Sequence, residues 1–182
     1  GSSILIRTQK HSLLYDAGPG FGGGFDAGAS IVVPAVQALG IHKLDGFVLS
    51  HGDMDHRGGM ASVLASLRPD QRWGGDDQAC LAGQSWQWDG VRFEFLHPQS
   101  RQYWSDNDAS CVLMISNGRT RSLLTGDIET LAEQDLLYAH GGDLQAAMKS
   151  QDRDAIKVLM RKRDGKPPLE ARRSGAGADG DT

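Results

Sequence analysis

The sequence reads Ser50-His51-Gly52-Asp53-Met54-Asp55-His56 at the point that decides the fold, directly after the apolar run Gly46-Phe47-Val48-Leu49. A short apolar run without alternation is typical of a strand that is buried on both faces. Imidazole and carboxylate groups are common protein ligands of zinc, manganese and iron. We therefore predict that a buried strand delivers four ligand-type side chains onto a metal site.

The spacing inside this stretch indicates how the ligands are shared. His51, Asp53 and Asp55 stand at alternate positions, so on an extended loop they project to one side, while His56 turns toward the following helix. Two ions roughly 3.5 to 4 Å apart could then act together, as in metal-assisted phosphoester or amide hydrolysis. The alternative is a solvated acidic turn. The strand before it and Gly58-Gly59 after it argue against that reading.

Carboxylates also end two other predicted strands. Asp127 follows an apolar run that closes on Gly126, and glycine lets a backbone approach a site closely. Asp127 could bridge two metal ions, or it could cap the helix predicted to follow. Asp16 follows Leu13-Leu14-Tyr15 in the same way and could lie at the same sheet edge as a possible metal ligand, or it could form the turn before Gly18-Pro19. Both roles stay open for each residue.

The remaining candidates lie in a loop before a later strand. Asn107 and Ser110 could contact metal, although single residues of these types more often form turns or caps. Cys80 and Cys111 have no second cysteine nearby, so neither belongs to a Cys-x-x-Cys zinc motif. We expect both cysteines to be small buried residues. A disulfide between them is compatible with the sequence but not predicted by it.

The order of predicted elements is a βαβ unit followed by a β-rich second half. The first two strands are expected at the edge of a larger sheet, and Ser30 is expected to cap the first helix. Strands are predicted over Ile4 to Arg7, Ser12 to Tyr15, Gly46 to Ser50, Ser85 to Asp89, Val91 to His97, Cys111 to Ser116 and Ser122 to Leu124, and helices over Ile31 to Leu39, Met60 to Leu67 and Ile128 to Ala139.

Composition limits the classes of partner. The net charge of −4 gives no sign of the basic surface through which proteins bind nucleic acid, although a bound cation would reverse the local field of acidic ligands. The apolar stretch from Ser30 to Ile41 contains Pro34 and falls short of the roughly 20 residues of a membrane span. With no leader segment at its start, the chain itself is expected to be soluble.

Four motifs, in this order, resemble the metallo-β-lactamase superfamily, and within it the C-terminal domain of the ComEC family of DNA-uptake channels. The superfamily usually has His-x-His-x-Asp-His before Gly-Gly, and Asp53 in place of the second His resembles the ComEC branch. The motifs are Leu14-Tyr15-Asp16-Ala17-Gly18-Pro19, Leu49 to Gly59, Asn107 to Leu113, and Leu124 to Glu129.

The resemblance implies an α/β fold, a metallo-β-lactamase-like αββα sandwich. It would occupy residues 1–142 as a partial domain, followed by a charged helical extension over 143–164 and a disordered tail over 165–182. The family has a preceding strand that ends in Asp-Val-Gly-Gln-Gly and a later His-His-Gly-Ser motif, and this chain has neither. His140-Gly141-Gly142 comes too early for that motif and is expected in a loop between two helices. The fold is therefore expected to be incomplete.

The resemblance also implies roles for single residues. His51 and Asp53 would bind one divalent ion, Asp55 and His56 the second, and Asp127 would bridge the ions or join the second. Mn²⁺ or Zn²⁺ is the expected metal. Asp55 and Asp127 are the implied catalytic residues.

Asn107 and Ser110 stand where the wider superfamily supplies a third histidine to the first metal. By the resemblance, that site would be short of ligands. Asn107 and Ser110 are therefore possible ligands of this site.

The implied function is a metal-dependent nuclease or phosphodiesterase that acts on DNA during competence. Its partners would be DNA and the channel domain of a parent membrane protein in the bacterial inner membrane, with this domain on the periplasmic side. Two alternatives stay open. The chain could be a catalytically impaired structural or DNA-guiding domain of the same channel, or a metallohydrolase of small molecules.

Overall fold

Strand β2 shows why the chain forms a layered structure, because its four residues are all buried and point alternately to two cores. The computed structural model describes residues 1–100 and 103–149. Its first sheet has the order β1-β2-β3-β4, in which β1 and β2 are antiparallel and the other neighbours are parallel. The strands are β1 (Ile4–Arg7), β2 (Ser12–Tyr15), β3 (Gly46–Val48) and β4 (Gln71–Trp73).

The second sheet is antiparallel throughout and has the order β5-β6-β7-β8. A register shift between Phe95 and His97 interrupts the pairing of β6 with β7, so the first pair of β7, Val112 with His97, is set apart from the rest of the ladder. The strands are β5 (Ser85–Trp88), β6 (Val91–His97), β7 (Val112–Ser116) and β8 (Arg121–Leu124).

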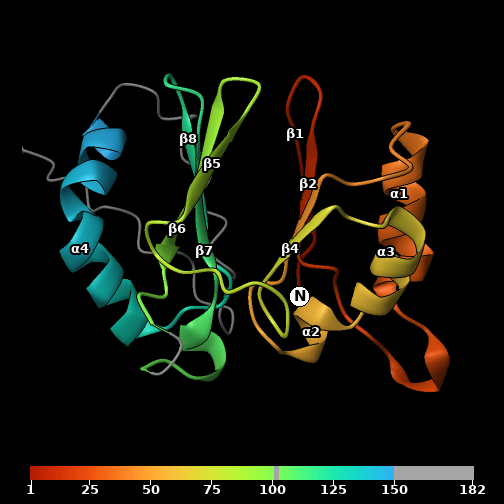
Figure 1. Cartoon of the computed structure of the whole chain (residues 1–182). Coiled ribbons are helices and arrows are strands. Elements are labelled where there is room, and N and C mark those ends of the chain that lie inside the picture. The colour runs from red at the N-terminus through yellow and green to blue at the C-terminus, as the bar shows by residue number, and fades with distance from the viewer. Residues whose placement is uncertain (101–102, 150–182) are drawn as a thin grey trace, which may run out of the picture.

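Helices cover the outer face of each sheet (Figure 1). α1 and α3 lie on the first sheet and α4 lies on the second, so the layers run helix, sheet, sheet, helix. This confirms the predicted αββα sandwich. The helices are the π-helical turn η2 (Gly28–Val32), α1 (Val33–Ala38), α2 (Met54–Arg57), α3 (Met60–Leu67) and α4 (Thr130–Lys149), with 3₁₀ turns η1 (Gly22–Gly24) and η3 (Asp106–Ala109).

Three apolar clusters hold the layers together. The cluster between the sheets joins Leu13 and Tyr15 of β2 to Phe93 and Phe95 of β6. A second cluster packs Leu14 and other residues of the first sheet against the helices outside it, and a third packs β6, β7 and β8 against α4. Alternation along each inner strand therefore places one side chain in the central layer and the next in an outer layer.

The two sheets also meet at the turns far from the first sheet's carboxyl edge. Asp89 Oδ2, in the β5–β6 turn, accepts hydrogen bonds from Thr8 Oγ1 and from the backbone nitrogen of Lys10, both at 2.6 Å. It also lies 3.0 Å from His11 Nδ1, and the His11 ring stacks on Trp88. One carboxylate thus joins the β1–β2 turn to the second sheet.

The predicted order of a βαβ unit and a β-rich second half is confirmed, and β1, β2, β6 and α3 have the predicted bounds. Three details differ. β2 lies inside its sheet, between β1 and β3, and only β1 lies at the edge. Strand β4 was not predicted. Helical structure begins at Gly28, so Ser30 is not its cap; Asp26 Oδ1 accepts a hydrogen bond from the backbone nitrogen of Ala29 instead.

The C-terminal helix also differs from expectation. α4 runs unbroken from Thr130 to Lys149, so His140-Gly141-Gly142 lies within a helix and not in a loop. The predicted extension lies outside the described residues from position 150 onward, as does the whole predicted tail over 165–182. Among the described residues, none of the helices combines the length and apolar character that a bilayer crossing requires.

Candidate metal centre

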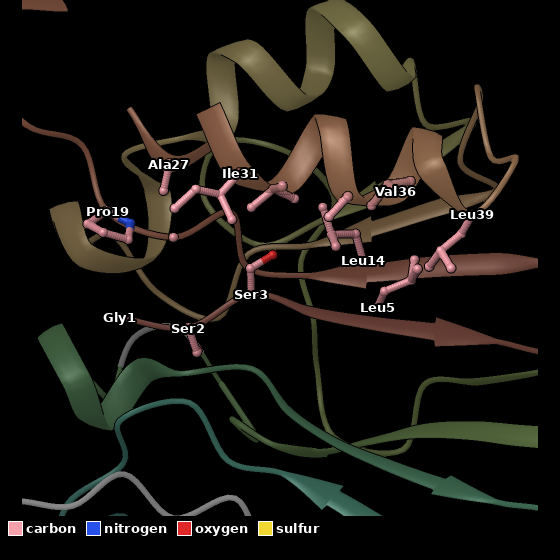
Figure 2. A pocket seen from close by; sticks show the side chains of 13 residues that line it. Gly1, Ser2, Ser3, Leu5, Leu14, Pro19, Ala27, Ile31, Val36 and Leu39 are labelled. Atoms are coloured by element: carbon pink, nitrogen blue, oxygen red, sulfur yellow. The ribbon is translucent and has the colours of Figure 1, made fainter. Parts of the chain in front are cut away.

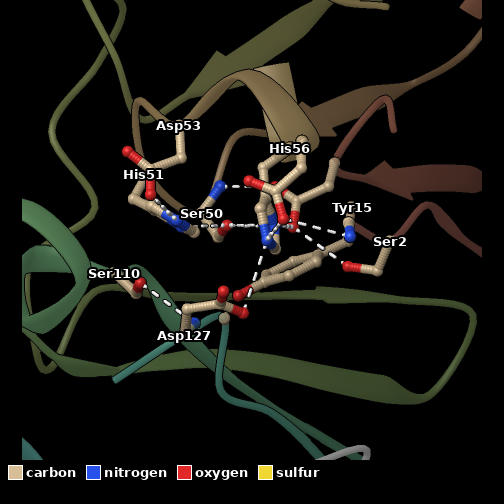
Figure 3. Close-up of polar contacts among 12 residues, drawn as sticks. Ser2, Tyr15, Ser50, His51, Asp53, His56, Ser110 and Asp127 are labelled. Atoms are coloured by element: carbon tan, nitrogen blue, oxygen red, sulfur yellow. Dashed lines mark hydrogen bonds and ion pairs between the residues drawn. The ribbon is translucent and has the colours of Figure 1, made fainter. Parts of the chain in front are cut away.

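The candidate ligands gather where strands of both sheets end. His51 follows β3, His56 lies on the short helix α2, and Asp127 follows β8 (Figure 3). Because α2 begins at Met54, Asp55 projects from a helical turn and not from the extended loop that we expected, and His56 lies on the same turn. The helix nevertheless brings His56 back over the end of β3, where the two imidazole rings lie 4.2 Å apart between centroids.

Asp16 contacts the candidate ligand His56 and lies behind it. Its carboxylate is fully buried, and Oδ2 lies 2.7 Å from His56 Nδ1. Asp16 adopts a left-handed backbone conformation (φ 62°), which aspartate tolerates better than most residues. Oδ1 accepts a hydrogen bond of 2.7 Å from the backbone nitrogen of Ser50. Asp16 therefore orients His56, beside its role in the turn.

Ser50 holds the second histidine. Its hydroxyl donates to Asp16 Oδ2 at 2.9 Å and lies 2.9 Å from His51 Nδ1, from which it accepts a hydrogen bond. In the neutral form, which is the form that binds metal, the network thus assigns a proton to Nδ1 of both His51 and His56 and leaves each Nε2 as an acceptor. Partners that fix the tautomer in this way are usual behind metal-binding histidines. Sequence reasoning missed this role of Ser50, although its position directly before His51 was a signal.

The two Nε2 atoms point to one place. Both are buried, and neither has a hydrogen-bond partner among the described residues. His56 Nε2 lies 3.3 Å from Asp127 Oδ1 without hydrogen-bonding geometry, and ligand atoms of His51, His56 and Asp127 all lie within 4.8 Å of one another. Because a buried polar atom without a partner costs free energy, a cation is a physically fitting occupant.

Asp53 and Asp55 each accompany one histidine. Asp53 Oδ2 lies 3.5 Å from His51 Nε2, and Asp55 Oδ2 lies 3.6 Å from His56 Nε2. Two ligands that each lie about 2.1 Å from a tetrahedral ion are separated by about 3.4 Å, so both distances suit a shared ion. Asp55 Oδ2 also lies 3.1 Å from the amino group of Gly1. The structure therefore brings all five predicted metal ligands together.

Asn107 and Ser110 act on the backbone around Asp127. Ser110 Oγ donates to Asn107 O at 2.7 Å and accepts a hydrogen bond of 3.2 Å from the backbone nitrogen of Asp127. The side-chain nitrogen of Asn107 donates to Glu129 Oε1 at 3.3 Å. Both residues lie beside the centre, and these hydrogen bonds position neighbouring residues.

Glycine is required before Asp127. Gly126 has φ 59°, and a Cβ atom there would lie 2.7 Å from Ser110 Cβ and 3.0 Å from Ser50 Cβ. The close approach expected from the sequence is therefore present. α4 begins only at Thr130, so Asp127 does not cap it, and the alternative reading of this residue is excluded.

The glycines after the metal motif pack main chain against main chain. A Cβ atom on Gly58 would lie 1.8 Å from the backbone nitrogen of Gly20, and one on Gly59 would lie 2.3 Å from Ala17 O. The loop after β2 therefore lies directly on the end of α2. Hydrogen bonds from Gly20 N to Met54 O and from Gly59 N to Gly18 O join the two segments.

The electrostatics of the metal-free centre are dominated by carboxylates. Burial lowers the pKa of His56, but Asp127 and Asp16 more than offset this effect and raise the pKa to about 9. Burial lowers the pKa of His51, and the neighbouring His56 acts in the same direction. Four carboxylates converge on two imidazoles here, counting Asp53 and Asp55. Such an acidic set requires positive charge, which fits divalent cations.

A disulfide lies beside this centre. Cys80 and Cys111 are both buried, as predicted, and are bonded to each other across 31 positions of sequence. The bond depends on Cα atoms 5.7 Å apart, which no local pattern could reveal.

A separate cavity of about 350 Å³ lies between β1 and the helical segment η2–α1 (Figure 2). Its lining is largely apolar and contains no titratable side chain. It therefore lacks the histidines and carboxylates that the candidate metal centre brings together. Among its lining residues are Leu5, Leu14, Ile31, Val36 and Leu39.

Comparisons with known proteins agree with this geometry. Residues 1–168 match the sequence profile of the metallo-beta-lactamase superfamily. The chain is 40% identical over 151 residues to "Competence protein ComA" of Neisseria gonorrhoeae, which covers 79% of this chain and 21% of that protein. It is 35% identical over 142 residues to "Recombination protein 2" of Haemophilus influenzae, which covers 74% of this chain and 18% of that protein. The chain thus spans about a fifth of the length of these relatives.

A solved structure shows the same fold. A metallo-β-lactamase from Cronobacter sakazakii matches with a TM-score of 0.53 and 18% identity, over 70% of this chain and 56% of that one. At this identity the likeness concerns the fold alone.

Proposed function

The chain belongs to the metallo-β-lactamase superfamily, and from this premise we propose that it is a metal-dependent phosphodiesterase or nuclease that acts on DNA during competence. One observation carries the proposal: two buried imidazole nitrogens without hydrogen-bond partners among the described residues face the carboxylate of Asp127. The names of the relatives, a competence protein and a recombination protein, support DNA as the substrate.

Five side chains would hold two divalent ions. We assign His51 with Asp53 to one ion and His56 with Asp55 to the other, because each pair has its ligand atoms 3.5 or 3.6 Å apart. Asp127 would contact the ion at His56 and is near enough to both histidines to bridge the pair. Bound ions would supply Lewis-acid activation of water and of the phosphoryl oxygens.

The other residues of the centre keep these ligands ready to bind. Asp16 and Ser50 hold a proton on each Nδ1 and so keep each Nε2 free. Ser110 fixes the backbone at Asp127. Preorganised ligands of this kind lose little freedom when a metal binds, which favours affinity.

A hydrolysis assay tests the proposal directly. Purified protein with Mn²⁺ or Zn²⁺ is expected to cleave single- or double-stranded DNA and bis(p-nitrophenyl) phosphate, and Asp55→Ala is expected to abolish both activities. Asp70→Asn is the matched control, because Asp70 is an exposed carboxylate paired with Lys43. Hydrolysis of the small diester without cleavage of DNA would instead support a small-molecule hydrolase.

A catalytically impaired, DNA-guiding domain is the second candidate. The observation that favours it is that Asn107 and Ser110 stand at the position of the superfamily's third histidine, where the Asn107 amide nitrogen donates to Glu129 Oε1 and Ser110 Oγ donates to Asn107 O. The ion at His51 and Asp53 would then have few protein ligands. Metal analysis by mass spectrometry separates the two: fewer than one ion per chain with no turnover supports the impaired domain, and two ions with turnover support the enzyme.

We also propose that the domain works on the periplasmic side of the inner membrane, as part of a longer channel protein. The relatives are about five times longer than the matched segment, which supports a larger parent. The Cys80–Cys111 disulfide supports an oxidising compartment, because cytosolic thiols are normally kept reduced. Thiol trapping in cells tests this: the pair should resist alkylation in the parent protein, and free thiols there would contradict the proposal.

A further inference from the structure

The Cys80–Cys111 disulfide lies next to residues that fix Asp127, although neither sulfur belongs to the candidate ligand set. We propose that this disulfide is a positioning element of the metal centre: it holds the segment Ser110-Cys111, and through that segment it holds Asp127 against His51 and His56. The proposal rests on the proposed function for its metal, but its structural part can be tested without metal.

The backbone of Cys111 joins the two sheets. Its nitrogen donates to Ser50 O at 2.9 Å, and its carbonyl oxygen accepts a hydrogen bond of 2.7 Å from the buried hydroxyl of Tyr15. Ser50 directly precedes His51 and contacts both imidazoles. A shift of Cys111 would therefore disturb the first sheet at the point where it carries the histidines.

Ser110 transmits the same constraint to Asp127. Its hydroxyl accepts the hydrogen bond from the backbone nitrogen of Asp127, and its Cβ and Oγ atoms define the space that only glycine fits at position 126. Ser110 itself is fully buried. The backbone of Asp127 is thus held by Ser110, the residue that directly precedes Cys111 of the disulfide.

The strand ladder alone does not hold this segment. Pairing of β7 with β6 begins with Val112 and His97, and the register shift separates this pair from the rest of the ladder. Ser110 and Cys111 lie just before that pair, after the 3₁₀ turn Asp106–Ala109. The covalent bond to Cys80 adds an anchor to the hydrogen bonds that join Cys111 to the first sheet.

Cys80 is a suitable anchor because its own segment is fixed to the second sheet. Ala82 N donates to Pro98 O at 2.9 Å, and Gly83 N donates to Phe95 O at 2.8 Å. Cys80 and Cys111 both belong to the apolar cluster between the sheets. The disulfide therefore connects the Cys80 segment to the Ser110-Cys111 segment within the central layer. The second of these segments holds the backbone of Asp127.

Formation of the bond is a two-electron oxidation. The two thiols lose two protons and two electrons, which a disulfide-containing oxidant accepts as it is reduced to a dithiol. Reduction by a phosphine reverses the step: the S–S bond breaks, water supplies the two protons of the thiols and the oxygen atom, and the phosphine becomes its oxide. The centre would thus reach full metal affinity only after oxidation of the chain.

Amide exchange measured by NMR tests the positioning claim on the metal-free protein. Phosphine reduction of the natural chain, or Cys80→Ala with Cys111→Ala, should speed exchange at positions 111 and 127 by about tenfold or more. The amides of α3 should keep their rates, since α3 lies on the outer face of the first sheet and packs in a different apolar cluster from the disulfide. Unchanged exchange at position 127, or an equal increase in α3 that signals general loosening, would overturn the proposal. The double variant should not respond to phosphine.

Metal titration completes the test. We expect Mn²⁺ affinity, measured by calorimetry, to fall about tenfold on reduction or in the double variant. Equal affinity in the oxidised and reduced chains would overturn the proposal. If the oxidised chain binds neither Mn²⁺ nor Zn²⁺, the proposed function fails, while the exchange rates at position 127 still decide whether the disulfide positions that residue.

Discussion

The two sheets have the same number of strands but contribute to the metal centre in different ways. The first sheet supplies both histidines and two carboxylates from the segment after β3, and Asp16 from the end of the neighbouring strand β2. The second sheet supplies one candidate ligand, Asp127. Because β2 and β3 are parallel, their carboxyl ends reach the same edge, which concentrates side chains there.

The manner of support differs as well. In the first sheet, side chains hold side chains, since Asp16 and Ser50 bind the imidazoles. In the second sheet, Ser110 holds the backbone of Asp127, and Gly126 allows the approach. We therefore expect the first half to be sensitive to the chemistry of its side chains and the second half to the shape of its backbone.

His56→Ala should have the largest effect. It removes a candidate ligand and leaves the buried carboxylate of Asp16 without its imidazole partner. Metal-dependent hydrolysis should disappear. The free energy of unfolding, measured in urea, should fall by about 3 kcal/mol. This is the lower end of the range for a broken buried ion pair, because Ser50 still donates a hydrogen bond to Asp16. His42→Ala is the control, since His42 is exposed. Activity that survives in His56→Ala would place the reaction elsewhere.

Asp16→Asn tests whether side chains govern the first half. The amide nitrogen would face His56 Nδ1 and favour the opposite tautomer, with the proton on Nε2. Metal affinity should fall by roughly 10- to 100-fold, as for other partners behind metal ligands, with the circular dichroism spectrum unchanged. Asp45→Asn is a matched control, because Asp45 accepts from the backbone nitrogen of Ser12 and contacts no imidazole. Equal affinities in the two variants would refute the positioning role.

Gly126→Ala tests whether backbone shape governs the second half. The added methyl would meet Ser110 and Ser50, so metal affinity should fall by about tenfold. The left-handed backbone conformation at this position should also lower the free energy of unfolding of the alanine variant. Gly118→Ala separates the two effects. Gly118 has φ 84° with no atom within 4 Å of an added Cβ, so it should cost roughly 1 to 2 kcal/mol of stability and leave affinity unchanged. If Gly118→Ala weakens metal binding equally, the close approach is not the cause.

Asp89→Asn should have the smallest effect and should leave metal binding unchanged. Hydrogen bonds from Thr8 and His11 hold the pKa of the Asp89 carboxyl well below its ordinary value of 3.8. A lowered pKa in the folded state contributes stability above pH 3.8 that is lost as the pH falls below it. Thermal unfolding should therefore show a midpoint a few degrees lower than that of the natural chain near neutral pH, and the difference should shrink in acid. A constant difference across pH would contradict this account.

The sequence predicts the elements that have a clear apolar pattern and misses those that lack one. β2, β6 and α3 are marked by buried runs, whereas β4 has two exposed polar residues, Gln71 and Arg72, and looks like a loop. The four-residue helix α2 is too short to show a period. Its existence depends on packing against the loop after β2, which only the fold reveals.

The candidate ligands were predictable because they are close in sequence or follow apolar strands. Their supporting contacts were not. The bond between Asp16 and His56 joins positions 40 apart, and the contact between Ser110 and Asp127 joins positions 17 apart. Neither spacing has a local signal, since both depend on which strand ends share an edge.

Gly58 and Gly59 determine the distance between the helix α2, which carries the candidate ligand His56, and the loop after β2. Main-chain atoms set this separation, because a Cβ atom on Gly58 would lie 1.8 Å from the backbone nitrogen of Gly20 and one on Gly59 would lie 2.3 Å from Ala17 O. Changes of side-chain volume elsewhere in the core therefore need not alter the height of His56. Over evolutionary time the apolar core could drift while the ligand geometry stays constant, provided that the two glycines are retained.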